Sequence, residues 1–215
     1  MNILDETTLI ISPHPDDEVL GCGGIISSIK DKGKLHILYI TNFHPLFAKE
    51  EYNKERLNLI SYLGCNEDVL IQTESLTNKL DTYPISCLIN SLEEKINKIK
   101  PTNIFVCFPS YNQDHRIVFD ALITATRPHD RNHFVKNIFV YEQPETLHTQ
   151  RLNGQFTPNF FAEIDIEKKI ELYKFYNTQQ RGHRDSETLR ALARLRGSYI
   201  AKPYAESFQT IRFTL

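Results

Sequence analysis

The stretch from Thr8 to Ile25 constrains the fold more than any other part of this 215-residue chain. It begins with an apolar run over 8–11, Thr-Leu-Ile-Ile, which has the length and composition of a buried strand. The next seven residues, Ser-Pro-His-Pro-Asp-Asp-Glu, place several ionisable side chains in a turn that two prolines stiffen by fixing φ. A helix opening on glycines is expected to follow. Such a density of charge at the end of a buried strand predicts a functional site.

Short apolar runs alternate with longer amphipathic runs along most of the chain. Strands are predicted over 8–11, 35–41, 68–71, 104–108, 138–141 and 208–215, and helices over 20–32, 50–63, 84–99, 117–127, 166–176 and 187–199. The polar segment 142–159 is predicted to be a loop. This alternation favours an α/β fold with a mostly parallel sheet. No repeat or linker divides the sequence, so we expect a single domain over 1–215.

Two clusters of polar residues follow predicted strands. His14, Asp16 and Asp17 come just after the first strand, and Asp114 and His115 follow the strand that ends at position 108. In parallel sheets, ligands bind beyond the carboxyl ends of the strands. If the two strands are neighbours, both clusters face one crevice, but the sequence alone does not establish that they are.

The residue types in these clusters are those of a metal centre. Catalytic zinc is usually held by three protein ligands, with a further position left to water. His14 and Asp17, three residues apart, can converge on one ion, and His115 is the best candidate for a third ligand. Asp16 could then act as general base, and Asp114 could orient a ligand. No cysteine is placed to join the set, which argues against a structural thiolate site.

Other interpretations of these residues must be weighed. A His-x-x-Asp pattern is common, and an isolated histidine is most often a packed or surface residue. The Gly-Cys-Gly-Gly sequence at 21–24 could cradle a phosphate in a nucleotide-binding oxidoreductase, but it does not match G-x-G-x-x-G. The metal site therefore remains the favoured interpretation.

Charge and cysteine usage narrow the possible partners and the cellular location. The formal net charge of −2 gives no global reason to expect binding to nucleic acid. The sequence shows neither a signal peptide nor an apolar run long enough to span a membrane, so no stable membrane insertion is expected. Four scattered cysteines without a C-x-x-C pair fit a reducing compartment, and we expect a cytoplasmic protein.

The motifs resemble those of the PIG-L/LmbE family of zinc-dependent N-acetyl-sugar deacetylases. The first is Pro-His-Pro-Asp-Asp-Glu over 13–18, followed by Val-Leu-Gly-Cys-Gly-Gly, and a second is Asn-Gln-Asp-His-Arg over 112–116. Further segments that fit the family lie at 63–64, 125–128, 141–142, 176–179 and 204–208. The resemblance extends over essentially the full length.

The resemblance implies a Rossmann-like three-layer fold with one zinc ion per chain. Its motifs carry over as His14, Asp17 and His115 for the metal and Asp16 for the general base. The implied reaction hydrolyses the acetamide of an N-acetylglucosamine unit, in a conjugate or a surface-polysaccharide precursor, to a free amine and acetate. The same zinc site acting on another amide or ester, or a non-catalytic sugar-binding homologue, are the alternatives. A homo-oligomer is also possible.

The sequence departs from the family pattern at two positions. Many members carry a histidine three residues before the third ligand, where this chain has Asn112, and an arginine where it has Tyr52. The group that stabilises the oxyanion together with the metal is therefore unassigned, and Asn112, His129 and His183 are the candidates.

A set of basic residues could contact the substrate. It either forms a solvated surface or clamps a phosphate or carboxylate of the substrate. Its members are Arg127, Arg131, Arg181, His183 and Arg184.

Overall fold

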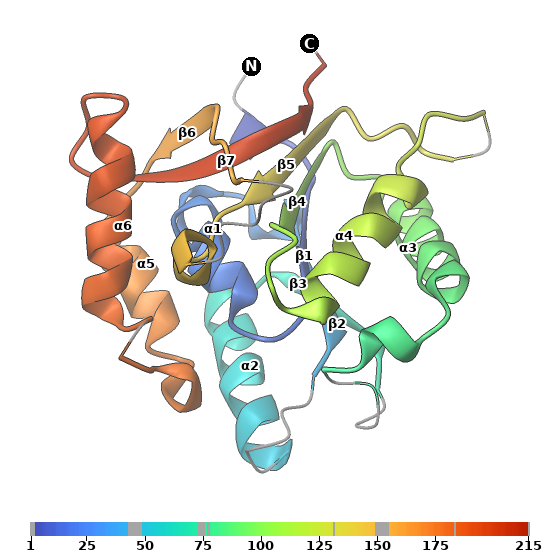
Figure 1. Ribbon diagram of the computed structural model, residues 1–215, viewed down its shortest axis with the longest axis horizontal. Helices are drawn as coiled ribbons and strands as arrows, with labels where there is room; N and C mark the ends of the chain where they lie inside the picture. Colours follow the sequence, from blue (N-terminus) through green and yellow to red (C-terminus); the bar gives the residue numbers. More distant parts are fainter. Residues whose placement is uncertain are drawn as a thin grey trace.

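One seven-stranded sheet runs through the centre of the molecule, with helices on both faces (Figure 1). The computed structural model describes residues 3–42, 49–72, 76, 78–130, 132–148, 155–182 and 184–214. The strands lie in the order β3-β2-β1-β4-β5-β7-β6. Their bounds are β1 Thr8–Ser12, β2 Leu35–Thr41, β3 Asn66–Ile71, β4 Asn103–Cys107, β5 Asn137–Tyr141, β6 Phe160–Glu163 and β7 Ala205–Arg212.

The first five strands are parallel, and β7 and β6 extend the sheet in antiparallel fashion. The mostly parallel α/β fold predicted from the alternation is thus confirmed. The strands β1, β4 and β5 are buried along their whole length, which explains their continuous apolar sequences.

The helices form a layer on each face of the sheet. Helices α3 and α4 pack together on one side, whereas α1, α5 and α6 lie on the other, where α1 contacts α5 and α5 contacts α6 (Figure 1). The bounds are α1 Asp17–Ser28, α2 Lys49–Leu63, α3 Ile85–Ile99, α4 Gln113–Ala125, α5 Ile166–Tyr173 and α6 Ser186–Ser198. No helix of the described residues is both long and apolar enough to span a bilayer.

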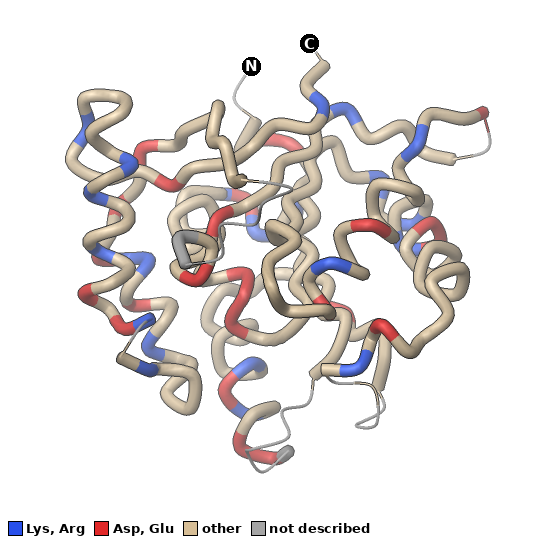
Figure 2. The backbone as a smooth tube through the Cα atoms, in the orientation of Figure 1, with Lys and Arg blue, Asp and Glu red and all other residues tan. Residues whose placement is uncertain are grey.

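Basic and acidic residues are interspersed along α5 and α6 (Figure 2). Arg190 on α6 contacts Glu167 on α5 and Glu187 on its own helix. Arg196 instead turns inward and forms a buried pair with Glu142. These arginines are therefore engaged in contacts between packed elements, and the pairs exposed to solvent add little stability.

The strand order fixes the position of the site. The chain moves from β1 to β2 and β3 on one side of β1, and then crosses to β4 on its other side. Strands β1 and β4 pair in parallel, with Thr8 opposite Asn103 and Ile11 opposite Val106. Their carboxyl ends therefore open at the point where the strand order reverses, the usual position of a ligand crevice in such sheets.

Candidate active site

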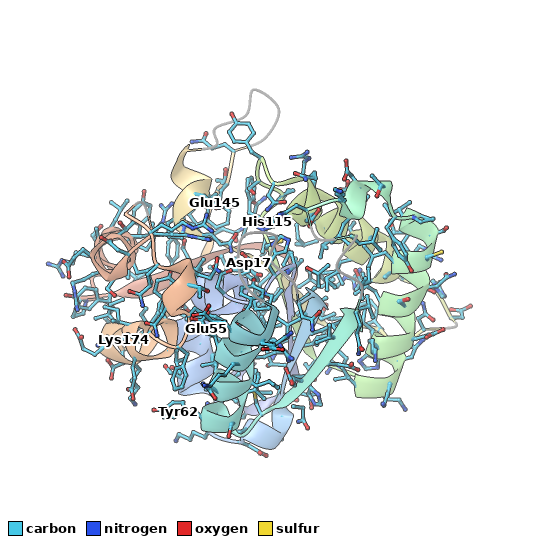
Figure 3. The ribbon with its side chains drawn as sticks, turned by 90° about the horizontal axis from the view of Figure 1, so that it is seen from below. Asp17, Glu55, Tyr62, His115, Glu145 and Lys174 are labelled. Atoms are coloured by element: carbon cyan, nitrogen blue, oxygen red, sulfur yellow. The ribbon has the colours of Figure 1, made fainter. Side chains whose placement is uncertain are left out.

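The two polar clusters meet at the carboxyl ends of β1 and β4. His14 follows β1, and Asp17 is the first residue of α1. His115 lies in the first turn of α4, which starts where the Asn112 side chain accepts a hydrogen bond from the Asp114 N–H at 2.9 Å. Figure 3 shows Asp17 and His115 side by side, although they come from different helices.

Three donor atoms converge as a metal site requires. His14, Asp17 and His115 each offer a ligand atom, and these atoms all lie within 4.8 Å of one another. Asp17 Oδ2 is 3.3 Å from His14 Nδ1 and 3.3 Å from His115 Nε2. Two ligands of a tetrahedral ion with bonds of about 2.0–2.1 Å lie about 3.3–3.4 Å apart. The donor types and both spacings therefore fit a zinc-like divalent ion.

His14 is held in place from its far side by a buried carboxylate. Its Nε2 lies 2.9 Å from Asp114 Oδ2, which leaves Nδ1 directed at Asp17. Asp114 also accepts the backbone N–H groups of Asn78 and Leu80, at 2.8 and 3.0 Å. A carboxylate fixed in this way sets both the tautomer and the orientation of the imidazole.

The other two candidate ligands have partners of their own. Gln143 donates its side-chain N–H to Asp17 Oδ1 at 2.6 Å. His115 Nδ1 lies 3.1 Å from the Ser110 hydroxyl and 3.5 Å from Glu145 Oε1, and Ser110 donates to Glu145 at 3.1 Å. Each candidate ligand thus presents one atom to the common centre while another atom of its side chain is anchored.

Burial and neighbouring charges act in opposite directions on the pKa values of His14 and Asp17. Burial lowers the pKa of His14, but hydrogen bonds and charge from Asp114 and Asp17 outweigh it and raise this pKa from 6.5 to about 10. Burial acts to raise the pKa of Asp17, yet the charge and hydrogen bond of His115, together with His14, lower it well below 3.8. The carboxylates of Asp17 and Asp114 therefore favour positive charge on the imidazole between them.

Asp16 sits beside this centre in a strained backbone conformation. Its φ is 112°, which residues with a Cβ rarely adopt, and its carbonyl accepts the Leu20 N–H at 2.9 Å to start α1. Its carboxylate is buried, and Oδ2 lies 3.3 Å from Arg184 Nη1. Burial raises the pKa of Asp16 well above 3.8, although Arg184 opposes this shift. Strain of this kind costs about 1–3 kcal/mol and is typical of active sites.

Glu18 fixes the turn that carries Asp16. Its carboxylate accepts the Asp16 N–H at 3.1 Å, the Ser12 hydroxyl at 3.0 Å, and the hydroxyls of Tyr39 and Tyr176 at 3.0 and 2.6 Å. Burial raises the pKa of Glu18 to about 7, although hydrogen bonds act to lower this pKa and the one from Tyr176 lowers it most. Four donors occupy the accepting capacity of a carboxylate, so we assign Glu18 to holding the turn in shape.

The predicted basic residues fall in different places. Arg184 reaches the site through Asp16. Arg127 lies beyond the far end of α4, where it pairs with Glu93 at 2.9 Å, and His129 lies near the same carboxylate at 4.0 Å. Arg131 and His183 lie outside the described residues.

Two residues at the site were not expected from the sequence, Gln143 and Glu145. Both lie in the segment predicted to be a loop, just past β5, and Glu145 belongs to the short 3-10 helix η5, Pro144–His148. Because β5 pairs with β4, its carboxyl end opens at the same edge of the sheet. Ligands bind beyond the carboxyl ends of parallel strands, so knowledge of the strand order would have indicated this segment.

Two histidines and one carboxylate, beside a strained aspartate at the switch point of an α/β sheet, match the ligand set of metal-dependent hydrolases. Comparison with known proteins supports this class of enzyme. The sequence model of the PIG-L family, described as GlcNAc-PI de-N-acetylase, matches residues 9–126, more than half of the chain. The protein belongs to this family of metal-dependent deacetylases.

Individual relatives are distant. The uncharacterized deacetylase YaiS of Escherichia coli K12 is 24% identical over 167 residues, which cover 74% of this chain and 82% of YaiS. The N,N'-diacetylchitobiose deacetylase of Pyrococcus horikoshii superposes with a TM-score of 0.76 at 20% identity, covering 96% of this chain and 84% of that chain.

The same fold also occurs in a protein of different chemistry. GalB, the 4-carboxy-2-hydroxymuconate hydratase of Pseudomonas putida KT2440, superposes with a TM-score of 0.72 at 16% identity, covering 98% of both chains. At such identities the likeness establishes the fold, and the reaction must be argued from the site.

Proposed function

We propose that this protein is a zinc-dependent hydrolase that removes the N-acetyl group from an N-acetylglucosamine-type amino sugar, in a conjugate or a surface-polysaccharide precursor. The observation that carries the proposal is the convergence of His14, Asp17 and His115 beside the buried carboxylate of Asp16. Membership of the PIG-L family supports the reaction class. The chitobiose deacetylase of similar fold supports an N-acetylated sugar.

The metal role follows from the donor set. His14, Asp17 and His115 would hold one zinc ion, and their spacing fits its bond lengths. A zinc ion bound there would polarise the acetyl carbonyl and lower the pKa of a coordinated water towards about 7. The three ligands would be held in position by their outer partners, which are Asp114, Gln143, Ser110 and Glu145.

Asp16 performs the proton transfers in this proposal. Its carboxylate takes a proton from the attacking water as the water oxygen bonds to the acyl carbon. The same carboxyl group then delivers that proton to the sugar nitrogen as the C–N bond breaks, which leaves a free amine and acetate. A carboxyl group whose pKa is raised by burial is suited to both steps, since it binds and releases a proton nearer to neutral pH.

Arg184 is the basic residue that we place at the substrate. Its guanidinium contacts Asp16, whereas Arg127 is engaged with Glu93 away from the centre. Asn112 is held at the start of α4, where its side-chain oxygen accepts the Asp114 N–H.

We propose further that residues 1–215 act as one domain and that the reaction takes place in the cytoplasm. The first part rests on the single sheet that includes strands from both ends of the described chain. The second rests on four free cysteines, of which Cys22 and Cys107 are buried.

Acetate release tests the proposed activity directly. Purified protein with measured zinc content would be offered free, nucleotide-linked, inositol-linked and lipid-linked N-acetylhexosamines. We expect acetate from one class, and we expect Asp16→Asn to keep zinc while losing at least about 100-fold in kcat. Asp120→Asn, which changes an exposed carboxylate on α4, is the matched control.

The other outcomes discriminate between the alternatives. One zinc per chain without acetate from any conjugate would move the proposal to another amide or an ester. Wild-type turnover by Asp16→Asn would remove Asp16 as the base. His115→Ala should lose zinc, and retention of one ion per chain would exclude His115 as a ligand. Neither zinc nor activity after metal is added would favour a sugar-binding protein.

A further inference from the structure

A hydrogen-bond donor that acts together with a metal accelerates amide hydrolysis, because negative charge develops on the acyl oxygen. Several donors close to the site already have other acceptors. The hydroxyls of Tyr39 and Tyr176 both donate to Glu18, and that of Tyr52 donates to the Pro15 carbonyl at 2.9 Å. These hydroxyls maintain the shape of the turn, so the donor must be sought elsewhere.

Two candidates for the second donor suggested by the sequence are poorly placed. Asn112 uses its side-chain oxygen to cap α4. His129 lies past the C-terminal end of α4, while the site lies at the N-terminal end of that helix, and its Nε2 contacts Asn132 at 3.0 Å. Neither residue therefore replaces the histidine that many family members carry at position 112.

Arg184 has both the position and spare donors. Its Nη1 lies 3.3 Å from Asp16 Oδ2, its Nη2 donates to Gln179 Oε1 at 3.2 Å, and its side chain is only 13% exposed. Tyr173 fixes the backbone by donating its hydroxyl to the Arg184 carbonyl at 2.8 Å. A guanidinium has five N–H groups, of which one donates to Gln179. The contact with Asp16 is an ion pair, because the buried Asp16 Oδ2 accepts no hydrogen bond. N–H groups on Nη1 and Nη2 thus remain for an oxygen of the substrate.

The carboxylates around the crevice stabilise the positive charge of Arg184. Carboxylates of Asp16, Asp17 and Glu145 all lie close enough to favour the charged form of Arg184, which outweighs burial and raises its pKa. Arg116, the neighbour of His115, instead donates to the carbonyls of Ser110 and Tyr111. A buried guanidinium among carboxylates is pre-oriented, so it can stabilise new negative charge without reorganising solvent.

We infer that Arg184 is a catalytic residue that donates a hydrogen bond to the acyl oxygen as it becomes negative, in the role the sequence left unassigned. This inference rests on the proposed amide hydrolysis. It differs from clamping an anion elsewhere on the substrate, since the interaction would strengthen only in the transition state. Such an interaction is lost in kcat and not in KM.

The first test compares Arg184→Gln and Arg184→Lys with wild type on the best acetylated substrate. We expect Arg184→Gln to lose about 100- to 1,000-fold in kcat with KM changed by less than about threefold. Arg184→Lys should recover part of this loss, since it keeps the charge without the planar fork. Arg190→Gln, which removes an arginine of α6 that pairs with Glu167 of α5, is the matched control and should keep wild-type kinetics.

The second test separates a direct role from one exerted through Asp16. An N-trifluoroacetyl substrate places electron-withdrawing fluorines beside the oxyanion, which then needs less help from a donor. We expect the deficit of Arg184→Gln to be at least about tenfold smaller for trifluoroacetyl than for acetyl. Equal deficits on both substrates would make Arg184 a positioning residue for Asp16 and overturn the inference.

Two further results would also overturn it. A raised KM with unchanged kcat would identify an anion clamp, and unchanged kinetics would remove Arg184 from the reaction. Both remain distinguishable from failure of the proposed function, because that failure appears as inactive wild type. Zinc content and the unfolding midpoint of each variant show that the site and the fold are intact.

Discussion

Replacing Asp114 with asparagine should uncouple metal binding from a proton on His14. Asp114 Oδ2 lies 2.9 Å from His14 Nε2 and has two backbone N–H donors of its own. In the metal-free chain this carboxylate, together with Asp17, outweighs burial and raises the pKa of His14 to about 10. A metal ion held by His14 would need the neutral imidazole, so its binding would displace that proton.

The size of the effect follows from the pKa. At pH 8, two units below about 10, the His14 ring of the metal-free protein is about 99% protonated. Zinc binding at pH 8 should therefore release nearly one proton from this ring, and apparent affinity should rise about tenfold per pH unit until about pH 10. In Asp114→Asn the pKa falls towards 6.5, so release at pH 8 drops and the affinity levels off at lower pH.

Calorimetry in buffers of different ionisation enthalpy would count the protons, and chelator competition from pH 6.5 to 9.5 would give the slope. The slope is the informative quantity, because loss of an outer partner also lowers intrinsic affinity by about 10- to 100-fold. Asp120→Asn, on an exposed face of the same helix, should behave as wild type. Equal proton release by wild type and Asp114→Asn at pH 8 would refute the coupling through Asp114.

Two further predictions concern the backbone around the site. Because Asp16 has a φ of 112°, Asp16→Gly should relieve backbone strain that Asp16→Ala retains. Urea unfolding of the metal-free protein should therefore show the glycine variant to be more stable than the alanine variant by about 1 kcal/mol or more. The reverse order would show that the turn is unstrained. A Cβ at Gly21 would lie 2.0 Å from Tyr141 Cδ2, so Gly21→Ala should lower stability by about 1–3 kcal/mol although alanine usually favours a helix. Gly182→Ala, with open space around its Cβ, is the control, and equal midpoints for the two alanine variants would contradict the clash.

Errors in the predicted boundaries have specific causes. The sequence predicts the first helix from residue 20, but the helix begins at Asp17, because the helix dipole and free N–H groups favour acidic residues in a first turn. The sequence predicts the last strand over 208–215, but β7 spans Ala205–Arg212. The strand thus includes Glu206, which is buried and accepts a hydrogen bond from Lys169 Nζ at 2.7 Å. The short strand β6 was not predicted at all.

The sequence by itself determined the α/β class and the three candidate metal ligands. It could do so because strand and helix have different apolar periods, and because His14 and Asp17 are close in the chain. Their convergence with His115, about 100 residues later, depends on the pairing of β1 with β4, which the alternation of elements leaves open. Tertiary structure alone brought Gln143 and Glu145 to the candidate ligands and Arg184 to Asp16. Side chains from distant segments acquire these roles only when the sheet aligns the strand ends that carry them.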